Sequence, residues 1–206
     1  MLRISRGERV GALGTHTTAI LLAAGLSARM GGDKLSLVYQ GKTLLERAVG
    51  LLHSLPCGEK IIVADEQRLG RIALPEGIAA VVNRNPQAGQ SESLRLGLGA
   101  ANPQQQWYLF LGADQPCLGV HALHPMFELA QSNPGKIIHP LVGGQPCSPV
   151  MFAANFREAL LAQTGDAGGR AVRAANAGHC VTFTPGQPDD FLDIDTPDDY
   201  RRLTGG

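Results

Sequence analysis

The chain has 206 residues, a length that fits one large domain better than two. Its 18 Lys and Arg residues balance its 18 Asp and Glu residues, and a net charge of zero argues against a protein that coats nucleic acid. The four cysteines form no C-x-x-C motif, and no apolar run approaches the ~20 residues that a membrane-spanning helix needs. We therefore expect a cytoplasmic protein with free thiols that binds neither nucleic acid nor membranes.

The first segment, residues 1–16, contains three arginines but no apolar stretch like that of a secretory signal. We expect it to be a flexible leader. A single folded domain is then predicted over residues 17–206.

Short β-rich runs alternate with amphipathic helical stretches along that domain. The predicted strands are Thr18–Leu22, Lys60–Ala64, Ile78–Val82, Trp107–Leu111, Lys136–His139, Ser148–Phe152, His179–Phe183 and Phe191–Ile194. The predicted helices are Thr43–Ser54, Ser91–Ala100, Val120–Gln131, Asn155–Gln163, Ala167–Asn176 and Pro197–Leu203. This alternation predicts a three-layer α/β domain with a mostly parallel central sheet, and ligands of such sheets bind beyond the carboxyl ends of the strands.

Local signals mark two helix starts and one turn. Thr43 with Glu46 forms a capping box, and Thr196 is an N-cap residue directly before a proline. Gly143-Gly144 lies between two β-like runs and predicts a hairpin excursion rather than a domain boundary.

The segment after the first strand, residues 22–34, reads LAAGLSARMGGDK. Its small residues and glycines allow backbone N–H groups to approach an anion, and Arg29 and Lys34 add positive charge. It is neither a Walker A loop nor a G-x-G-x-x-G motif. From the residues alone, an anion-binding loop and an ordinary strand-to-helix turn both remain open.

The same segment resembles the signature L-A-[AG]-G-x-S-x-R-M-G-x-x-K of the molybdopterin nucleotidyltransferases, and in particular their molybdenum cofactor cytidylyltransferase branch, within the MobA-like NTP transferases. The resemblance runs from about Thr18 to the C-terminus, and it implies a Rossmann-like nucleotidyltransferase domain whose loop wraps the triphosphate of a nucleotide. The nucleotide-binding residues implied in the loop are Ala23, Ala24, Gly25, Gly31, Gly32 and Lys34, with catalytic roles for Arg29 and Lys34.

An acid follows the apolar strand predicted over residues 107–111. Asp114 lies in the string GADQP, and the carboxyl end of a buried strand is where a Mg²⁺ ligand would sit, although a lone Asp also forms Asx turns. The D-x-P pattern resembles the family's metal-binding Asp, and this resemblance implies a catalytic and metal-binding role for Asp114.

A second group of acids lies near the C-terminus. The string DIDTP, residues 193–197, is similar to the family's C-terminal motif and implies that Asp195 is the second Mg²⁺ ligand. In a strand, Asp193 would lie on the same face as Asp195, and it is a weaker candidate for the same role. Asp198 and Asp199 have a simpler interpretation as acids in the first turn of a helix.

Amides and hydroxyls follow the predicted strand 78–82. From the residues alone they suit either recognition of a base and ribose or an ordinary serine-capped loop. The string resembles the family segment that places the base and sugar, which implies nucleotide-binding roles for Asn83, Gly89, Gln90, Ser91 and Ser93.

Two later strings resemble the part of the family that faces the second substrate. GQPCSP, residues 144–149, stands where the family usually has G-x-P-G-x-P, with Cys147 in place of the glycine. TGDAGGR, residues 164–170, resembles G-D-x-G-x-R and also suits a helix start with an Asp cap. The implied second-substrate residues are Gly144, Pro149, Gly165, Asp166 and Arg170.

The resemblance implies transfer of CMP from CTP to the terminal phosphate of molybdopterin or the molybdenum cofactor, with release of pyrophosphate and dependence on Mg²⁺. CTP rather than GTP is expected because Ala24 stands where guanylyltransferase relatives commonly have glycine. A GTP-using enzyme and a cytidylyltransferase acting on a sugar or polyol phosphate are alternatives. A non-catalytic nucleotide-binding regulator ranks below them, because it would keep the loop but lose Asp114 and Asp195. A recipient molybdoenzyme or its chaperone is the implied protein partner.

Overall fold

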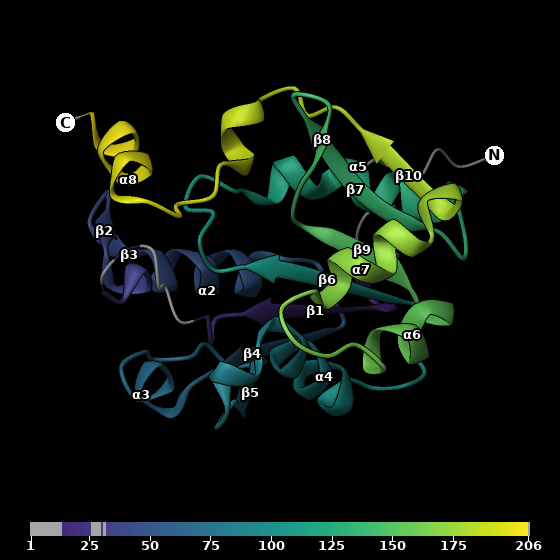
Figure 1. Cartoon of the computed structure of the whole chain (residues 1–206), viewed down its shortest axis with the longest axis horizontal. Helices are drawn as coiled ribbons and strands as arrows, with labels where there is room; N and C mark the ends of the chain where they lie inside the picture. The colour runs from purple at the N-terminus through teal and green to yellow at the C-terminus, as the bar shows by residue number, and fades with distance from the viewer. Residues whose placement is uncertain (1–13, 26–29, 31, 206) are drawn as a thin grey trace.

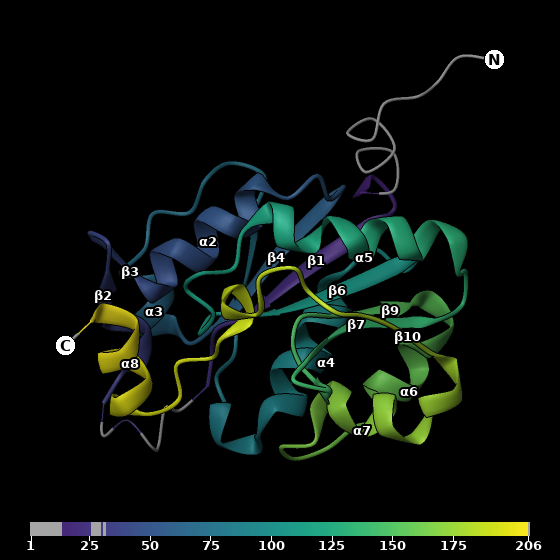
Figure 2. The ribbon, with the colours of Figure 1, turned by 90° about the horizontal axis from the view of Figure 1, so that it is seen from above.

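The computed structural model describes residues 14–25, 30 and 32–205. Residues 1–13 of the expected leader, together with Arg29 and Gly31, lie outside this described part. Helices flank a central sheet on both faces (Figures 1 and 2). In the part of the chain that is described, no helix is both long enough and apolar enough to cross a membrane.

The central sheet is built mostly from parallel strands. Its strands are β1 (Thr17–Leu22), β4 (Glu59–Ala64), β5 (Ala79–Val82), β6 (Trp107–Gly112), β7 (Ile137–Val142), β8 (Gln145–Pro146), β9 (Val150–Ala153) and β10 (Cys180–Phe183). They lie in the order β10-β7-β9-β6-β1-β4-β5, and β8 pairs with β7. β1 is parallel to β4 and β6, and β4 to β5, whereas β9 is antiparallel to both of its neighbours. The expected fold class is confirmed.

The middle strands are mostly apolar, as expected where helices cover both faces of a sheet. Ile20 of β1, Ile62 of β4 and Leu109 of β6 are all fully buried. With the core filled on both sides, open space for a ligand arises beyond the carboxyl ends of these strands.

Two sets of helices form the outer layers. The helices are α2 (Leu44–Ser54), α3 (Glu66–Leu69), α4 (Gln90–Ala100), α5 (Val120–Ser132), α6 (Arg157–Leu161), α7 (Gly168–Ala175) and α8 (Pro197–Thr204). Figure 2 shows α2 and α5 on one face of the sheet and α4, α6 and α7 on the other. Gly97 lets α4 approach the sheet closely, since a Cβ at this position would lie 2.6 Å from Cγ2 of Ile20.

The turn predicted at Gly143-Gly144 is a hairpin turn. Both residues have positive φ, 56° and 77°, which is the conformation that a two-residue hairpin loop requires. The turn joins β7 to β8, and Val142 pairs with Gln145 across it. A second hairpin, β2 (Val38–Tyr39) with β3 (Lys42–Thr43), and the short helix α3 were not predicted from the sequence.

The strand predicted over residues 191–194 is wrong. Phe191 ends a 3₁₀ turn that begins at Pro188. The backbone N–H of Ile194 donates to the carbonyl of Asp114 at 2.9 Å, and the carbonyl of Phe191 accepts a hydrogen bond from Gln115 Nε2 at 3.1 Å. The backbone groups of Phe191 and Ile194 are therefore bonded to the segment after β6 and not to a neighbouring strand. As a result, the alternation of side chains along a strand does not determine where Asp193 and Asp195 point.

The capping box predicted at the start of α2 is present. Thr43 Oγ1 accepts from the N–H of Glu46 at 3.1 Å, and Glu46 Oε2 accepts from the N–H of Thr43 at 2.7 Å. Thr43→Ala is therefore expected to lower the free energy of unfolding by about 1 kcal/mol in a urea titration. Thr43→Ser keeps the hydroxyl and serves as the matched control. An equal loss in both variants would contradict a capping role for the hydroxyl.

Candidate active site

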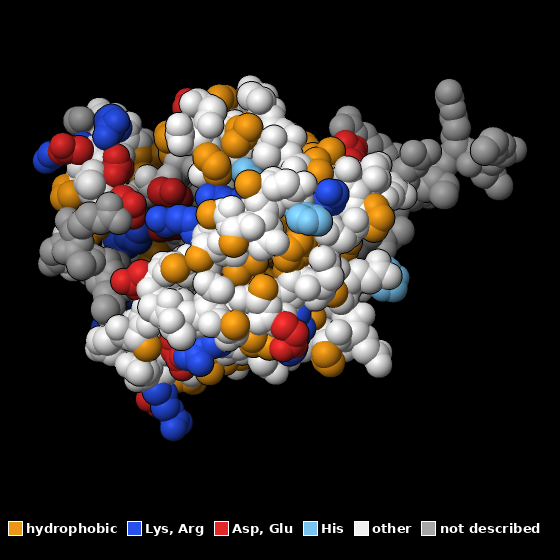
Figure 3. Space-filling view, turned by 45° about the vertical axis from the view of Figure 1, so that its right-hand side comes forward, with side chains coloured by type: hydrophobic (Ala, Val, Ile, Leu, Met, Phe, Trp, Pro, Cys, Tyr) orange, Lys and Arg blue, Asp and Glu red, His pale blue; other side chains and the backbone are white. Residues whose placement is uncertain are grey.

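A cavity of about 550 Å³ opens where β1 and β6 end. It gathers residues from the segment after β1, the loop before α4, the segment after β6, the region around the start of α7, and the C-terminal acidic segment. The predicted residues that line it are Ala23, Ala24, Gly25, Lys34, Gly89, Gln90, Ser93, Asp114, Asp166, Arg170, Asp193 and Asp195. Figure 3 shows acidic and basic side chains gathered in the hollowed left-hand part of one face, while uncharged groups dominate its centre.

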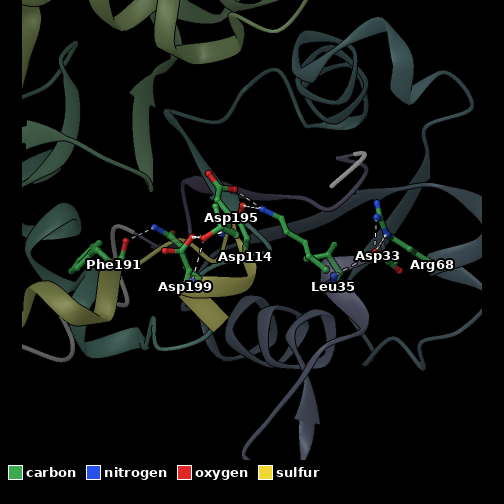
Figure 4. Close-up of polar contacts among 10 residues, drawn as sticks. Asp33, Leu35, Arg68, Asp114, Phe191, Asp195 and Asp199 are labelled. Carbon is green, nitrogen blue, oxygen red and sulfur yellow. Dashed lines mark hydrogen bonds and ion pairs between the residues drawn. The ribbon is translucent and has the colours of Figure 1, made fainter. Parts of the chain in front are cut away.

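Lys34 lies between two carboxylates. Its Nζ donates to Asp114 Oδ2 at 2.7 Å and to Asp195 Oδ1 at 2.9 Å, and Figure 4 shows Asp114 and Asp195 side by side. Burial alone would lower the pKa of Lys34, but the two carboxylates more than offset this, and the net shift is upward. The ammonium is therefore charged at neutral pH, and it brings the two acids toward one point.

Asp114 is placed by the end of β6. Its main-chain carbonyl accepts from Ile194 N–H, and its carboxylate lies in the cavity, where it contacts Lys34. Gly112, the last residue of β6, makes room for that carboxylate, because a Cβ on Gly112 would lie 2.5 Å from Asp114 Oδ1. The glycine and the C-terminal segment together determine where the carboxylate points.

Asp195 is placed by the start of α8. The backbone N–H groups of Asp195 and Thr196 both donate to Asp199 Oδ2, at 3.2 Å and 2.8 Å. The hydroxyl of Thr196 in turn accepts from the N–H of Asp199 at 3.2 Å, which completes a capping box. The Thr196 side chain holds the pKa of Asp199 below its ordinary value, with backbone hydrogen bonds adding to the effect. Asp199 thus caps α8 and also holds the backbone at Asp195.

A third carboxylate, that of Asp193, lines the cavity together with Asp114 and Asp195. Desolvation by the surrounding cavity wall raises the pKa of its carboxyl group to about 7, and repulsion from Asp114 and Asp195 adds to the rise, while Lys34 and a hydrogen bond from Gln115 oppose it. Asp193 lines the same cavity as the other two acids although no strand places it there.

The predicted base-reading residues divide into two groups. Gly89, Gln90 and Ser93 line the cavity, but Asn83 and Ser91 are each 1% exposed and do not. Asn83 Nδ2 donates to Ser93 Oγ at 2.9 Å, so this buried amide holds a residue that does face the cavity.

Ser91 joins this loop to the segment 164–170, for which a second-substrate role was predicted, since its Oγ donates to the carbonyl of Gly165 at 2.5 Å. Gly89 approaches Gly165 so closely that a Cβ on Gly89 would lie 2.5 Å from the Gly165 carbonyl carbon, and its φ of +91° also favours glycine. Asp166 and Arg170 continue this segment into the cavity. The two loops therefore form one wall.

The predicted second-substrate string 144–149 reaches the cavity at one point only. Ser148 lines it, whereas Gly144 and Pro149 do not. Gly144 belongs to the hairpin turn, and Gly32 of the glycine loop also lies outside the cavity lining. The roles predicted for Arg29 and Gly31 fall on residues that the structure does not describe and stay predictions.

Two buried side chains at this site were missed by sequence reasoning. Gln115, the residue after Asp114, donates from Nε2 to the carbonyls of Ser148 and Phe191, at 3.2 Å and 3.1 Å. It thereby links the segment after β6 to two other segments of the chain near the cavity. Its place next to Asp114 was a usable signal. Arg68, on α3, contacts both the residue after β1 and Asp33, and nothing local in the sequence marked it.

The chain is similar to known sequences over most of its length. The family described as the MobA-like NTP transferase domain matches residues 19–180. A probable molybdenum cofactor guanylyltransferase of Deinococcus radiodurans is 31% identical over 91% of this chain and 94% of its own length. The nicotine blue oxidoreductase of Paenarthrobacter nicotinovorans is 32% identical over 74% of this chain and 79% of its own length. A 2-C-methyl-D-erythritol 4-phosphate cytidylyltransferase of Photobacterium profundum is 33% identical over 59% of this chain and 54% of its own length.

Solved structures share the fold. Rv0371c of Mycobacterium tuberculosis H37Rv superposes with a TM-score of 0.76 at 24% identity, covering 94% of this chain and 100% of that one. Its complex with manganese gives a TM-score of 0.72 at 23% identity, covering 92% of this chain and 98% of that one.

Proposed function

Because the chain belongs to the MobA-like NTP transferase domain family and is a nucleotidyltransferase, we propose that it transfers CMP from CTP to the terminal phosphate of molybdopterin, free or carrying molybdenum. The observation that carries this proposal is the pairing of Lys34 with Asp114 and Asp195 in the cavity beyond β1 and β6. One basic group that can neutralise phosphate charge and two carboxylates that can hold a divalent cation meet there.

The proposed reaction needs charge balance and alignment more than proton transfer. An oxygen of the acceptor phosphate bonds to the α-phosphorus of the nucleotide, and the bond from that phosphorus to the bridging oxygen breaks and releases pyrophosphate. The attacking phosphate is already ionised at neutral pH, so no general base is required. Lys34 balances charge on the leaving pyrophosphate, and the walls of the cavity hold the two substrates in line.

We propose Asp114 and Asp195 as the ligands of a Mg²⁺ ion. Among the described residues, no three His, Cys, Asp or Glu side chains form a ready-made metal cage. Two carboxylates that converge on one ammonium fit Mg²⁺ nonetheless, because this ion takes one or two carboxylates and fills its other positions with water and substrate phosphates. When bound, the ion neutralises charge on the phosphates. The manganese complex of Rv0371c supports a divalent cation for this fold.

The identity of the nucleotide depends on the wall formed by the segment after β1. Ala24 is 3% exposed and lines the cavity, and its methyl group takes space that a glycine would leave to a larger base. This feature supports CTP. The alternative, GTP, is supported by the guanylyltransferase from Deinococcus radiodurans, which matches almost the whole chain.

Pyrophosphate release tests the function directly. The protein is incubated with Mg²⁺, each nucleoside triphosphate in turn, and molybdopterin, the molybdenum cofactor or a series of sugar and polyol phosphates. We expect release with CTP and a pterin acceptor, and Ala24→Gly should shift the CTP-to-GTP ratio of kcat/KM toward GTP. No release with any pterin acceptor would overturn the proposed acceptor, and a wild-type preference for GTP would overturn the proposed nucleotide.

A further inference from the structure

Arg68 is a buried cation that joins the two segments on either side of the glycine loop. One of its terminal nitrogens, Nη1, donates to the carbonyl of Ala23 at 2.8 Å, and the other, Nη2, donates to Asp33 Oδ1 at 2.7 Å. Ala23 directly follows β1, and Asp33 directly precedes Lys34. A single side chain on a different element, α3, therefore connects the residue where the loop leaves the sheet with the residue before the catalytic lysine.

Asp33 links Arg68 to the turn that begins at Lys34. It is the N-cap of the 3₁₀ turn Lys34–Ser36, where its carboxylate accepts from the N–H of Leu35 at 3.3 Å and from the hydroxyl of Ser36 at 2.9 Å. Burial on its own raises the pKa of Asp33, but the hydrogen bond and charge of Arg68 and the donors of the turn outweigh it, so the net shift is downward. Asp33 is thus an ionised carboxylate shared between Arg68 and the first turn after the loop.

The middle residue of that turn is fixed in the core. Leu35 is 4% exposed and belongs to the main hydrophobic core. Figure 4 shows the order of the groups, with Arg68 and Asp33 on one side of Leu35 and the two cavity aspartates on the other. The backbone at Lys34 is therefore held from both sides, and its long side chain crosses from the Asp33 turn to the carboxylates.

Arg68 is itself held in place by its own helix. Asp65, the N-cap of α3, accepts from the N–H of Arg68 at 2.9 Å and forms an ion pair with Nη1 at 3.1 Å. The planar fork of an arginine can serve a carbonyl and two carboxylates together, which the single ammonium of a lysine cannot do.

We propose that Arg68 is a positioning residue that, through Asp33, sets where the ammonium of Lys34 lies relative to Asp114 and Asp195. This proposal rests on the nucleotidyl transfer proposed above for the importance of Lys34, but the placement of Lys34 can be measured without any turnover.

The first measurement is the reactivity of Lys34. The Lys34 side chain is 13% exposed and tied to two carboxylates, so the wild-type amine should react slowly with an acetylating ester, followed by peptide mass spectrometry. In Arg68→Met we expect acetylation at Lys34 to rise at least about fivefold, because the loss of local contacts opens that segment more often. Acetylation of the exposed Lys42 in the same molecules is the internal reference, and Arg71→Met, at an exposed arginine near α3, is the matched variant.

The second measurement is turnover. Misplacement of Lys34 should lower kcat/KM for the nucleotide by about tenfold to a hundredfold in Arg68→Met, with Arg71→Met unchanged. Arg68→Lys should retain only part of the wild-type kcat/KM, because an ammonium cannot make all the contacts of the guanidinium. Should Arg68→Met fail to fold, Asp33→Asn decides by the same two criteria, because it keeps the shape of the cap and removes the charge that Arg68 holds.

A folded Arg68→Met or Asp33→Asn protein with wild-type acetylation of Lys34 and wild-type kcat/KM would overturn the proposal and leave Arg68 a stabiliser of the fold alone. If the wild-type protein releases no pyrophosphate with any acceptor, the proposed function fails. The acetylation rates then still decide the positioning role independently.

Discussion

Asp114→Asn is expected to abolish most of the pyrophosphate release by this protein, lowering kcat by roughly a hundredfold or more. Asparagine keeps the shape of the side chain but removes the negative charge that faces Lys34 and the proposed Mg²⁺ ion. The fold should survive, because Asp114 makes its contact with Ile194 through the main-chain carbonyl, which the substitution leaves in place. Turnover and thermal unfolding measured on the same preparation separate the two effects.

Asp189→Asn is the matched control for that experiment. Asp189 is an exposed acid of the same C-terminal run and lies outside the cavity lining, so its charge should not matter to turnover. Wild-type rates in Asp114→Asn would show that the metal assignment is wrong. A loss of the same size in Asp189→Asn would point to the overall acidity of the segment instead.

Lys34→Met is expected to lower kcat/KM for the nucleotide by about a hundredfold or more, with effects on both KM and kcat. The lysine contacts both predicted metal ligands and is predicted to face the triphosphate, so its loss removes charge in the ground state and in the transition state. Steady-state kinetics with varied nucleotide at saturating acceptor give the two parameters separately.

Two further variants define what the lysine contributes. Lys42→Met removes an exposed lysine from the β2–β3 hairpin and should behave as wild type. Lys34→Arg retains the charge but not the compact ammonium, and partial activity is expected. Full activity of Lys34→Met would remove Lys34 from the proposed mechanism, whatever the outcome for Asp114.

Much of the fold follows from local pattern. The apolar runs that form β1, β4 and β6, the capping box at Thr43 and the paired glycines of the β7–β8 hairpin all act within a few residues of sequence. The strand predicted over residues 191–194 failed for a related reason. Its short apolar pattern is the same in a strand as in an irregular segment, and only the bonds to Asp114 and Gln115 distinguish the two.

The candidate site likewise contains some residues whose position could be predicted from the sequence and others whose position could not. Asp114 lines the cavity, as expected from its place after a buried strand and from the resemblance of its D-x-P pattern to the family's metal-binding Asp. Asn83 and Ser91 have the polar groups expected of a nucleotide contact, yet the fold turns both inward, where they hold Ser93 and Gly165. Composition cannot separate a polar group that faces a ligand from one that braces a loop, because the same hydrogen-bonding atoms serve both purposes.

By itself the sequence determined the class of the fold, because the alternation of strands and helices is a local pattern, and it marked the glycine loop, Asp114 and Asp195 through short motifs that resemble those of a known family. Only the tertiary structure decided that Lys34 meets Asp114 and Asp195, which lie 80 and 161 positions away, and that Arg68 joins Ala23 to Asp33. Such contacts depend on how the sheet orders its strands, and strand order is a property of the whole packed chain.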